Sequence, residues 1–250
     1  MAPGFTGRKF SLNNGRLKIS YHNYRERTYI IVPVFNEDEM INTVVKDLEG
    51  LGCHLIVVDD GSLKPVSQSL QAVERLTCIR HKVNLGQGAA IQTGIDFALA
   101  KGAAFFVTFD ADGQHRAEDI PSLLIPLING DADIVLASRF ISGQSHKVPL
   151  VKRMLLRIGR YVNYAFTGLY LTDAHNGLRA LNRAAALTIR INENRMAHAT
   201  EILDQVKKHR LRYKEIGAPV IYTAYSRGKG QSYWNSIKIF FDLLLQKLFG

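Results

Sequence analysis

Short, continuous hydrophobic runs alternate with helical patterns along the first part of the chain. The runs are rich in β-branched and aromatic residues and cover residues 29–34, 55–58, 105–109 and 133–138. Runs of this length and composition are typical of strands that are buried on both faces of a sheet. Because such strands alternate with helices, the chain is predicted to form an α/β fold with a mostly parallel central sheet and right-handed crossovers.

Residues typical of helix starts and ends predict two of the helices between these strands. Asn36 is a residue type that caps helices, and the acidic residues at 37–39 favour a first helical turn. Hydrophobic residues then recur with helical spacing as far as Gly50, where this helix is expected to end. The second helix is predicted from Gly86 to Lys101.

A pair of glycines opens the second helix. Gly86 and Gly88 resemble part of a dinucleotide-binding fingerprint, and helix N-termini attract phosphate groups. However, Ile91 stands where the fingerprint needs its third glycine. A dehydrogenase-type phosphate site is therefore not expected here.

The composition is that of an ordinary globular protein. Of the 250 residues, 46% are hydrophobic and 22% are charged, which excludes a disordered, collagen-like or coiled-coil chain. No hydrophobic run reaches the roughly 18–20 residues of a membrane-spanning helix, and residues 1–10 lack the apolar core of a signal peptide. Cys53 and Cys78 match no metal-binding or disulfide pattern, so both are expected to be reduced thiols.

The net charge of +10 is unevenly distributed along the chain. Residues 28–136 hold seven basic and fifteen acidic side chains, whereas residues 137–250 hold nineteen basic and six acidic ones. The acidic part suits a metal or a ribose, and the basic part suits phosphates, an anionic membrane or nucleic acid. Nucleic acid is not expected, because the basic run at residues 207–212 lacks interleaved aromatic residues.

Acidic pairs follow two of the predicted strands. Asp59 and Asp60 end one run, and Asp110 and Asp112 follow another. In an open α/β sheet, ligands bind at the carboxyl ends of the strands. Alternate positions at a strand end point the same way, so Asp110 and Asp112 would repel each other unless a cation such as Mg²⁺ or Mn²⁺ lay between them. A solvated turn is the alternative for each pair.

Six ordered segments together resemble the motifs of glycosyltransferase family 2, and the last three resemble its dolichyl- or polyprenyl-phosphate sugar synthase branch. This resemblance implies a GT-A (Rossmann-like) fold, a nucleotide-sugar donor and inversion at the anomeric carbon. The segments are 33–37 (PVFNE), 58–62 (VDDGS), 110–115 (DADGQH), 138–140 (SRF), 173–179 (DAHNGLR) and 227–232 (RGKGQS).

The resemblance also implies roles for individual residues. It places the nucleotide-sugar against Pro33, Phe35, Glu37, Asp59, Asp60, Ala111 and Arg179. It assigns a Mg²⁺ or Mn²⁺ ion, which would neutralise charge on the departing nucleoside diphosphate, to Asp110, Asp112 and Gln114. It places the reacting groups near Asp173, Arg139, Arg153 and Arg227.

The reaction implied by the resemblance is transfer of a sugar from a UDP- or GDP-sugar to a polyprenyl (dolichyl or undecaprenyl) phosphate at the cytoplasmic membrane face. Such a phosphate, with a second pKa of about 6, is largely ionised and needs no general base. A sugar hydroxyl of a lipid-linked or cell-surface glycan is the alternative acceptor and would need a base, for which Asp173 and then Glu201 are candidates. A non-catalytic nucleotide-sugar-binding subunit is a further alternative, against which the intact Asp110 and Asp112 argue.

The chain is predicted to consist of a basic arm at 1–27, a GT-A glycosyltransferase domain at 28–232 and an apolar C-terminal amphipathic helix at 233–250. Residues 149–170 combine arginines with a hydrophobic stripe at helical spacing, which suits either a membrane surface or a helix that packs on the core. The C-terminal helix is too short and too charged to span a membrane comfortably. Peripheral contact with an anionic membrane is expected, and packing on the domain or a homodimer are alternatives for this helix.

Overall fold

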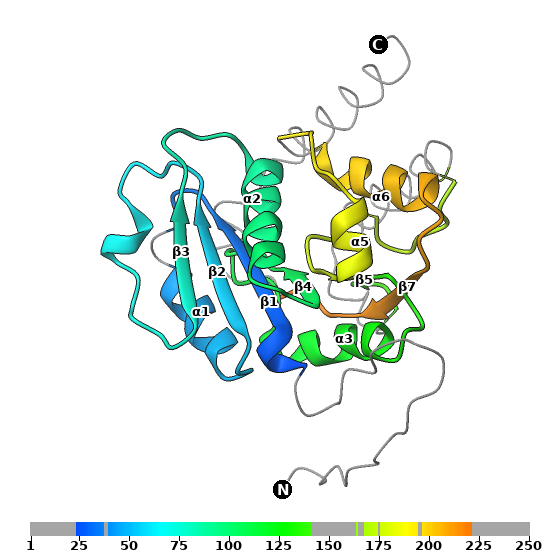
Figure 1. The fold of residues 1–250 in the computed structure, drawn as a ribbon. Coiled ribbons are helices and arrows are strands. Elements are labelled where there is room, and N and C mark those ends of the chain that lie inside the picture. The colour runs from blue at the N-terminus through cyan, green and yellow to red at the C-terminus, as the bar shows by residue number, and fades with distance from the viewer. Residues whose placement is uncertain are drawn as a thin grey trace, which may run out of the picture.

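The structure is a computed structural model, and Figure 1 shows its fold. Several predictions concern residues outside its described part and stay predictions: most of the N-terminal arm, most of the helix at 149–170, the C-terminal helix, and the roles of Arg153 and Arg227. The described residues are 24–37, 40–141, 164, 168–174, 176–194 and 197–221.

Seven strands of the described chain form one mixed sheet, in the order β3-β2-β1-β4-β6-β5-β7. β6 runs antiparallel to β4 and β5, and every other neighbouring pair is parallel. This arrangement confirms the predicted α/β fold with a mostly parallel sheet. The strands are β1 (Thr28–Val34), β2 (His54–Asp59), β3 (Leu76–Arg80), β4 (Phe105–Thr108), β5 (Ile134–Ser138), β6 (Arg179–Asn182) and β7 (Tyr213–Gly217).

β1, β2, β4 and β5 lie where the sequence predicts strands, to within one residue at each end. Their residues are almost all buried, which explains why their hydrophobic runs are continuous. The hydrophobic pattern of the sequence does not predict β3, β6 and β7. β3 and β7 are only partly buried at the sheet's edges, and β6 is four residues long, so none of them has a distinct hydrophobic pattern.

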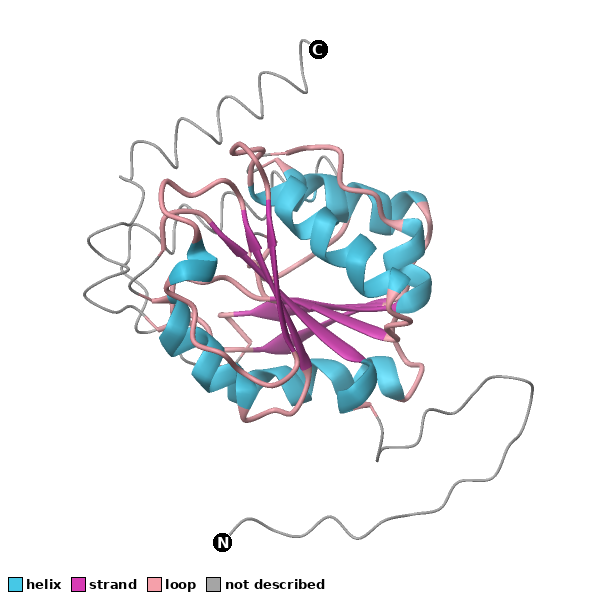
Figure 2. Cartoon of the chain, turned by 60° about the vertical axis from the view of Figure 1, so that its left-hand side comes forward, coloured by secondary structure: helices cyan, strands magenta, loops and turns pink. Residues whose placement is uncertain are grey.

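Helices cover both faces of the sheet, as Figure 2 shows. α1 and α3 pack on the face that Ile30 and Val32 line, whereas α2, α5 and α6 pack on the face of Ile31 and Ile56. None of these helices combines the length and the hydrophobicity needed to cross a membrane. They are α1 (Ile41–Glu49), α2 (Gln87–Ala100), α3 (Ile120–Ile128), α5 (Arg183–Thr188) and α6 (His198–Lys208), with 3-10 turns η1 (Arg25–Arg27), η2 (Val66–Gln68) and η3 (Ala117–Asp119).

The first predicted helix begins later than expected. α1 starts at Ile41, so the prediction that Asn36 caps it is wrong. Asn36 has a left-handed backbone with φ of 54°, and its side-chain oxygen accepts a hydrogen bond from the backbone N–H of Leu63 (2.9 Å). The asparagine therefore joins the loop after β1 to the loop after β2, because its short side chain tolerates φ above zero and binds backbone nearby.

Candidate active site

The acidic loops meet at one edge of the sheet. β1, β2 and β4 run parallel, so their carboxyl ends lie together. The start of α2 links the two loops: the backbone N–H of Gly86 donates to Oδ2 of Asp60 (2.7 Å), and the side-chain amide of Gln87 donates to Oδ1 of Asp110 (2.8 Å). The two acidic motifs, more than 40 residues apart in the chain, thus border one site.

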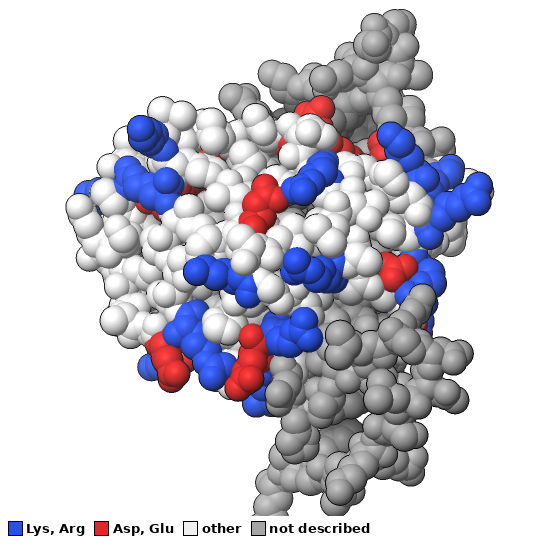
Figure 3. Space-filling model, viewed as in Figure 1, with Lys and Arg blue, Asp and Glu red and all other residues white. Residues whose placement is uncertain are grey.

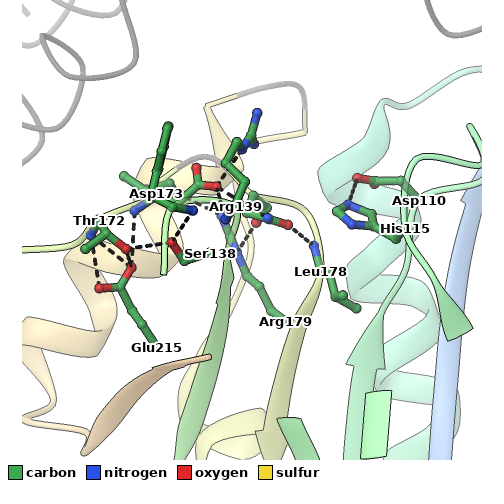
Figure 4. Close-up of polar contacts among 12 residues, drawn as sticks. Asp110, His115, Ser138, Arg139, Thr172, Asp173, Leu178, Arg179 and Glu215 are labelled. Atoms are coloured by element: carbon green, nitrogen blue, oxygen red, sulfur yellow. Dashed lines mark hydrogen bonds and ion pairs between the residues drawn. The ribbon is translucent and has the colours of Figure 1, made fainter. Parts of the chain in front are cut away.

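Asp110 is contacted on both of its carboxylate oxygens. Gln87 binds Oδ1, and Nε2 of His115 lies 3.6 Å from Oδ2 (Figure 4). Burial raises the pKa of Asp110, but a hydrogen bond and positive charge from His115 outweigh it, and the pKa lies below its ordinary value. His198 and Arg179 lower it further. Asp110 therefore stays ionised and is suited to bind a cation or to accept a hydrogen bond from a ribose hydroxyl.

Asp112 is the second carboxylate of the motif. Its Oδ1 accepts a hydrogen bond from the backbone N–H of Gln114 (2.9 Å). Burial raises the pKa of Asp112, and the negative charges of Asp110 and Glu37 raise it further. Asp110 and Glu37 therefore repel the charge of Asp112, and a divalent cation beside Asp112 would offset this repulsion.

The oxygen ligands at this place suit a metal ion that is also coordinated by the substrate. No three His, Cys, Asp or Glu side chains of the described residues come together as a preformed metal site. Mg²⁺ ordinarily takes one or two carboxylates and completes its shell with water and phosphate oxygens. Asp110 and Asp112, with Gln114 beside them, fit that arrangement.

Arg179 brings a buried positive charge to the same edge. It begins β6, is 3% exposed, and donates from Nε to the carbonyl oxygen of Asn176 (3.1 Å). Burial lowers the pKa of Arg179 to about 10, while Asp110 and Asp173 act to raise it. The guanidinium therefore remains charged at neutral pH and balances the carboxylates near it.

Asp173 and Arg139 form a buried ion pair. Oδ2 of Asp173 accepts from Nε of Arg139 at 2.6 Å and from the Arg139 backbone N–H at 3.1 Å (Figure 4). The Asp173 side chain is 1% exposed and that of Arg139 is 12% exposed. Since removal of either partner would leave a buried charge uncompensated, each side chain fixes the place of the other.

Glu215 in β7 is a residue of this site that the sequence analysis does not identify. Its carboxylate accepts hydrogen bonds from the backbone N–H groups of Thr172 and Asp173 and from the Thr172 hydroxyl, at 2.9–3.2 Å. The hydroxyl of Ser138 lies 2.6 Å from that of Thr172. No local signal marks Glu215 in the sequence, because these partners lie 42 and 43 residues away.

Asp59, which the sequence analysis places near the nucleoside, binds loop backbone in the structure. Its oxygens accept from the backbone N–H groups of Ser62 (2.9 Å) and Val66 (3.1 Å). Nη1 of Arg80 lies 3.3 Å from Oδ2. The carboxylate is fully buried, and it holds the turn that follows β2 in shape.

Asp60 is engaged in the same way. Its oxygens accept from the backbone N–H groups of residues 85 and 86 and lie 2.7 Å from Nδ1 of His81. The backbone N–H of Gly88 donates to the carbonyl oxygen of Asn194. At the start of α2, the N–H groups of Gly86 and Gly88 thus already have partners.

The other sequence candidates lie at different depths. Phe35, directly after β1, is 45% exposed, whereas Pro33 is half-buried within β1 and Ala111 is buried. Phe35 is thus the one of these three that offers an open apolar face to a ligand. Glu201, the second candidate for a base, accepts hydrogen bonds from the backbone of residues 192 and 193 and so holds that segment against α6.

Comparison with known proteins identifies relatives of this chain. The sequence profile of Glycosyl transferase family 2 matches residues 29–190. An uncharacterized protein of Methanocaldococcus jannaschii is 35% identical over 90% of this chain and 94% of its own length. A UDP-N-acetylglucosamine--dolichyl-phosphate N-acetylglucosaminyltransferase of Methanococcus voltae is 32% identical over 88% of this chain and 96% of its own length.

The fold is also found among solved structures. Glucosyl-3-phosphoglycerate synthase from Mycobacterium tuberculosis, crystallised with Mn²⁺, uridine diphosphate and phosphoglyceric acid, superposes with a TM-score of 0.61. The match covers 82% of this chain and 74% of that one, at 15% identity. At this level of identity the likeness concerns the GT-A fold.

Proposed function

Because the chain belongs to glycosyltransferase family 2 and is a glycosyltransferase, we propose that it transfers a sugar from a UDP-sugar to a dolichyl or other polyprenyl phosphate. The Methanococcus voltae relative, named for UDP-N-acetylglucosamine and dolichyl phosphate, supports this choice because it aligns over nearly its whole length. N-Acetylglucosamine is the first sugar to test, and mannose is the second, since other relatives are named as polyprenol- or dolichol-phosphate mannose enzymes.

One observation carries the proposal: two arginines lie on neighbouring strands at the sheet edge that holds the acidic motif. Asp110 follows β4, Arg179 begins β6 and Arg139 follows β5, and these three strands are neighbours in the order β4-β6-β5. Carboxylates suit the cation of a nucleoside diphosphate, and guanidinium groups suit phosphate oxygens. A site that combines them at one sheet edge suits two phosphate-bearing substrates, a nucleotide-sugar and a lipid phosphate.

The proposed metal site consists of Asp110, Asp112 and Gln114. Several structures of the Mycobacterium tuberculosis enzyme contain Mn²⁺ or Mg²⁺ with uridine diphosphate, which supports the use of either ion. When bound, the ion would neutralise the charge that develops on the departing diphosphate. Burial raises the pKa of Asp112 most, and the added repulsion from Asp110 and Glu37 would then be relieved.

The reaction needs no general base in this proposal. An oxygen of the acceptor phosphate attacks the anomeric carbon, the bond from that carbon to the β-phosphate oxygen breaks, and the electron pair leaves with the nucleoside diphosphate. Attack opposite the leaving group inverts the anomeric configuration. Arg139 binds the attacking phosphate, and Asp173 orients Arg139 through their ion pair, so Asp173 is a positioning residue.

The acceptor also determines where the enzyme works. A polyprenyl phosphate is held in a membrane, so its phosphate must be reached at the membrane surface. We place the reaction at the cytoplasmic face, with the chain as a peripheral partner whose net charge of +10 favours anionic lipids. Arg153 and Arg227 are proposed as further phosphate ligands on the strength of their sequence motifs.

The experiment is release of nucleoside diphosphate from a panel of UDP- and GDP-sugars, with Mn²⁺ or Mg²⁺, with and without a short-chain polyprenyl phosphate. One UDP-sugar should turn over only with the lipid phosphate, EDTA should stop the reaction, and mild acid should release the sugar from the product. Asp112→Asn should abolish turnover, whereas Asp47→Asn, on the exposed side of α1, should not. Turnover that ignores the lipid phosphate, or an acid-stable product, would point instead to a hydroxyl acceptor.

A further inference from the structure

The structure assigns a positioning role to Glu215: we propose that its carboxylate sets the geometry of Arg139 for the acceptor phosphate, acting through Thr172 and Asp173. This inference rests on the function proposed above. Glu215 belongs to none of the motifs that carry the family resemblance. It reaches the site from β7, which pairs with β5 so that Glu215 lies opposite Leu136, three residues before Arg139.

Glu215 binds the segment at residues 172 and 173 directly. The two backbone N–H groups of this segment and the Thr172 hydroxyl all donate to Glu215, and the distances to Oε1 are 2.9, 3.2 and 2.9 Å. The Thr172 N–H also lies 3.0 Å from Oε2. The Thr172 N–H thus contacts both oxygens, and an ionised carboxylate can accept on both, whereas an amide would set its own NH₂ donor against this N–H.

The hydrogen bonds continue from Thr172 to the residues beside Arg139. Because the Thr172 hydroxyl gives its proton to Glu215, the Ser138 hydroxyl donates to Thr172 across 2.6 Å. The Ser138 oxygen in turn accepts from the backbone N–H of Phe140 (3.2 Å). Glu215 thus orders a chain of hydrogen bonds that holds the residues on both sides of Arg139.

The side chain of Arg139 is held by the same group of residues. Asp173, whose backbone N–H is held by Glu215, receives both the backbone N–H and Nε of Arg139 on one oxygen. Figure 4 shows Glu215, Thr172, Ser138, Asp173 and Arg139 as one connected group. Loss of the Glu215 charge should therefore weaken three contacts that hold Arg139 in place: those of its chain neighbours Ser138 and Phe140 and that of its ion-pair partner Asp173.

The test compares Glu215→Gln with wild type and with Glu74→Gln, a control that removes an exposed carboxylate before β3. Hydrogen exchange of the Arg139 Nε–H is followed by ¹⁵N NMR, the signal being assigned with Arg139→Lys. Michaelis constants are measured for the UDP-sugar and for the polyprenyl phosphate. Glu215→Gln should speed the exchange and raise the acceptor constant, each by at least about tenfold, and change the donor constant less than twofold.

A second pair of variants protects the test against a folding defect. Thr172→Val keeps the shape but removes the hydroxyl that joins Glu215 to Ser138, and should change the same two quantities in the same direction. Thr172→Ser keeps a hydroxyl and should behave nearly as wild type. The two variants are compared because a general loss of stability would not depend on whether residue 172 has a hydroxyl group.

Three outcomes decide the matter. Wild-type exchange and acceptor constants in Glu215→Gln would overturn the proposal. Equal increases of both Michaelis constants, in step with a lower free energy of unfolding, would show a purely structural role and also overturn it. If the wild type transfers no sugar to any polyprenyl phosphate, the proposed function fails, and the exchange rate of Arg139 alone decides whether Glu215 positions it.

Discussion

Gly177 lies directly against the carboxylate of Asp110. A Cβ at position 177 would come closer than 3.0 Å to the carboxyl carbon and to both oxygens of Asp110. The carbonyl oxygen of Gly177 accepts a hydrogen bond from the Thr108 hydroxyl (2.6 Å), so the backbone there has little freedom to move away. Because Gly177 in the DAHNGLR motif has no side chain, the carboxylate of Asp110 has the space that it occupies.

Gly177→Ala should therefore displace the Asp110 carboxylate. We expect kcat/KM to fall by about 10–100-fold, because a displacement of about 1 Å in a catalytic site has effects of that order. The affinity for Mn²⁺ with UDP should fall in parallel, as titration calorimetry would show. Gly50→Ala is the control, since its Cβ would meet only the carbonyl oxygen of Asp47 at 3.8 Å. Wild-type metal affinity in Gly177→Ala would contradict the proposed position of the metal.

Asp173→Asn separates a positioning role from a general base. If Asp173 only orients Arg139, kcat/KM for the lipid phosphate should fall by roughly tenfold, since the amide oxygen can still accept from Nε of Arg139. Loss of a general base would cost up to about 10⁴-fold. Initial rates with a short polyprenyl phosphate measure the difference. Urea unfolding must accompany them, because the buried Arg139 loses its counter-charge and stability should also fall.

Asp60→Asn should act mainly on stability. The carboxylate holds the start of α2 and His81, and loss of hydrogen bonds to a buried charged group costs about 1.5–3 kcal/mol each at most. We expect a lower free energy of unfolding in urea, with Asp47→Asn as a control on the exposed side of α1. Unchanged stability together with a much weaker affinity for UDP would instead mean that Asp60 contacts the donor directly.

The free energy of unfolding should depend on pH through Asp133. Its oxygens accept from Nε, Nη2 and the backbone N–H of Arg212 and from the side chain of Asn182, and the hydrogen bond from Arg212 above all lowers the pKa of Asp133 to about 2. Because the folded-state pKa lies below the unfolded one of about 3.9, this stabilisation is fully present well above that pH and is lost as the pH falls through about 2.

Asp133→Asn should therefore lose about 1 kcal/mol of unfolding free energy at pH 7, a discounted figure because the Arg212 side chain is half exposed. The difference from wild type should shrink steadily below pH 4 and be small by pH 2. Asp131→Asn, which loses a more exposed ion pair with Lys214, should show a smaller effect at every pH. Urea unfolding curves between pH 2 and pH 7 measure both, and a difference that does not change with pH would refute this interpretation.

The sequence alone predicted the strands at 29–34 and 105–109, the acidic residues that follow such strands, and the family. These features depend on local chemistry. A strand buried on both faces must be hydrophobic along its whole length, whichever strands lie beside it. Once the parallel order follows from alternating strands and helices, Asp60 and Asp110 must lie at the same edge.

Other features arise only when distant parts of the chain meet. β6 has four residues and begins with the buried Arg179, and it is a strand because β4 and β5 offer it hydrogen bonds on both sides. Asp60 could not be recognised as a loop anchor until α2 placed backbone N–H groups against it. Glu215 finds its partners 42 and 43 residues away. The residues next to a carboxylate in the sequence do not determine which groups it binds, so its role depends on the hydrogen-bond donors that the folded chain places around it.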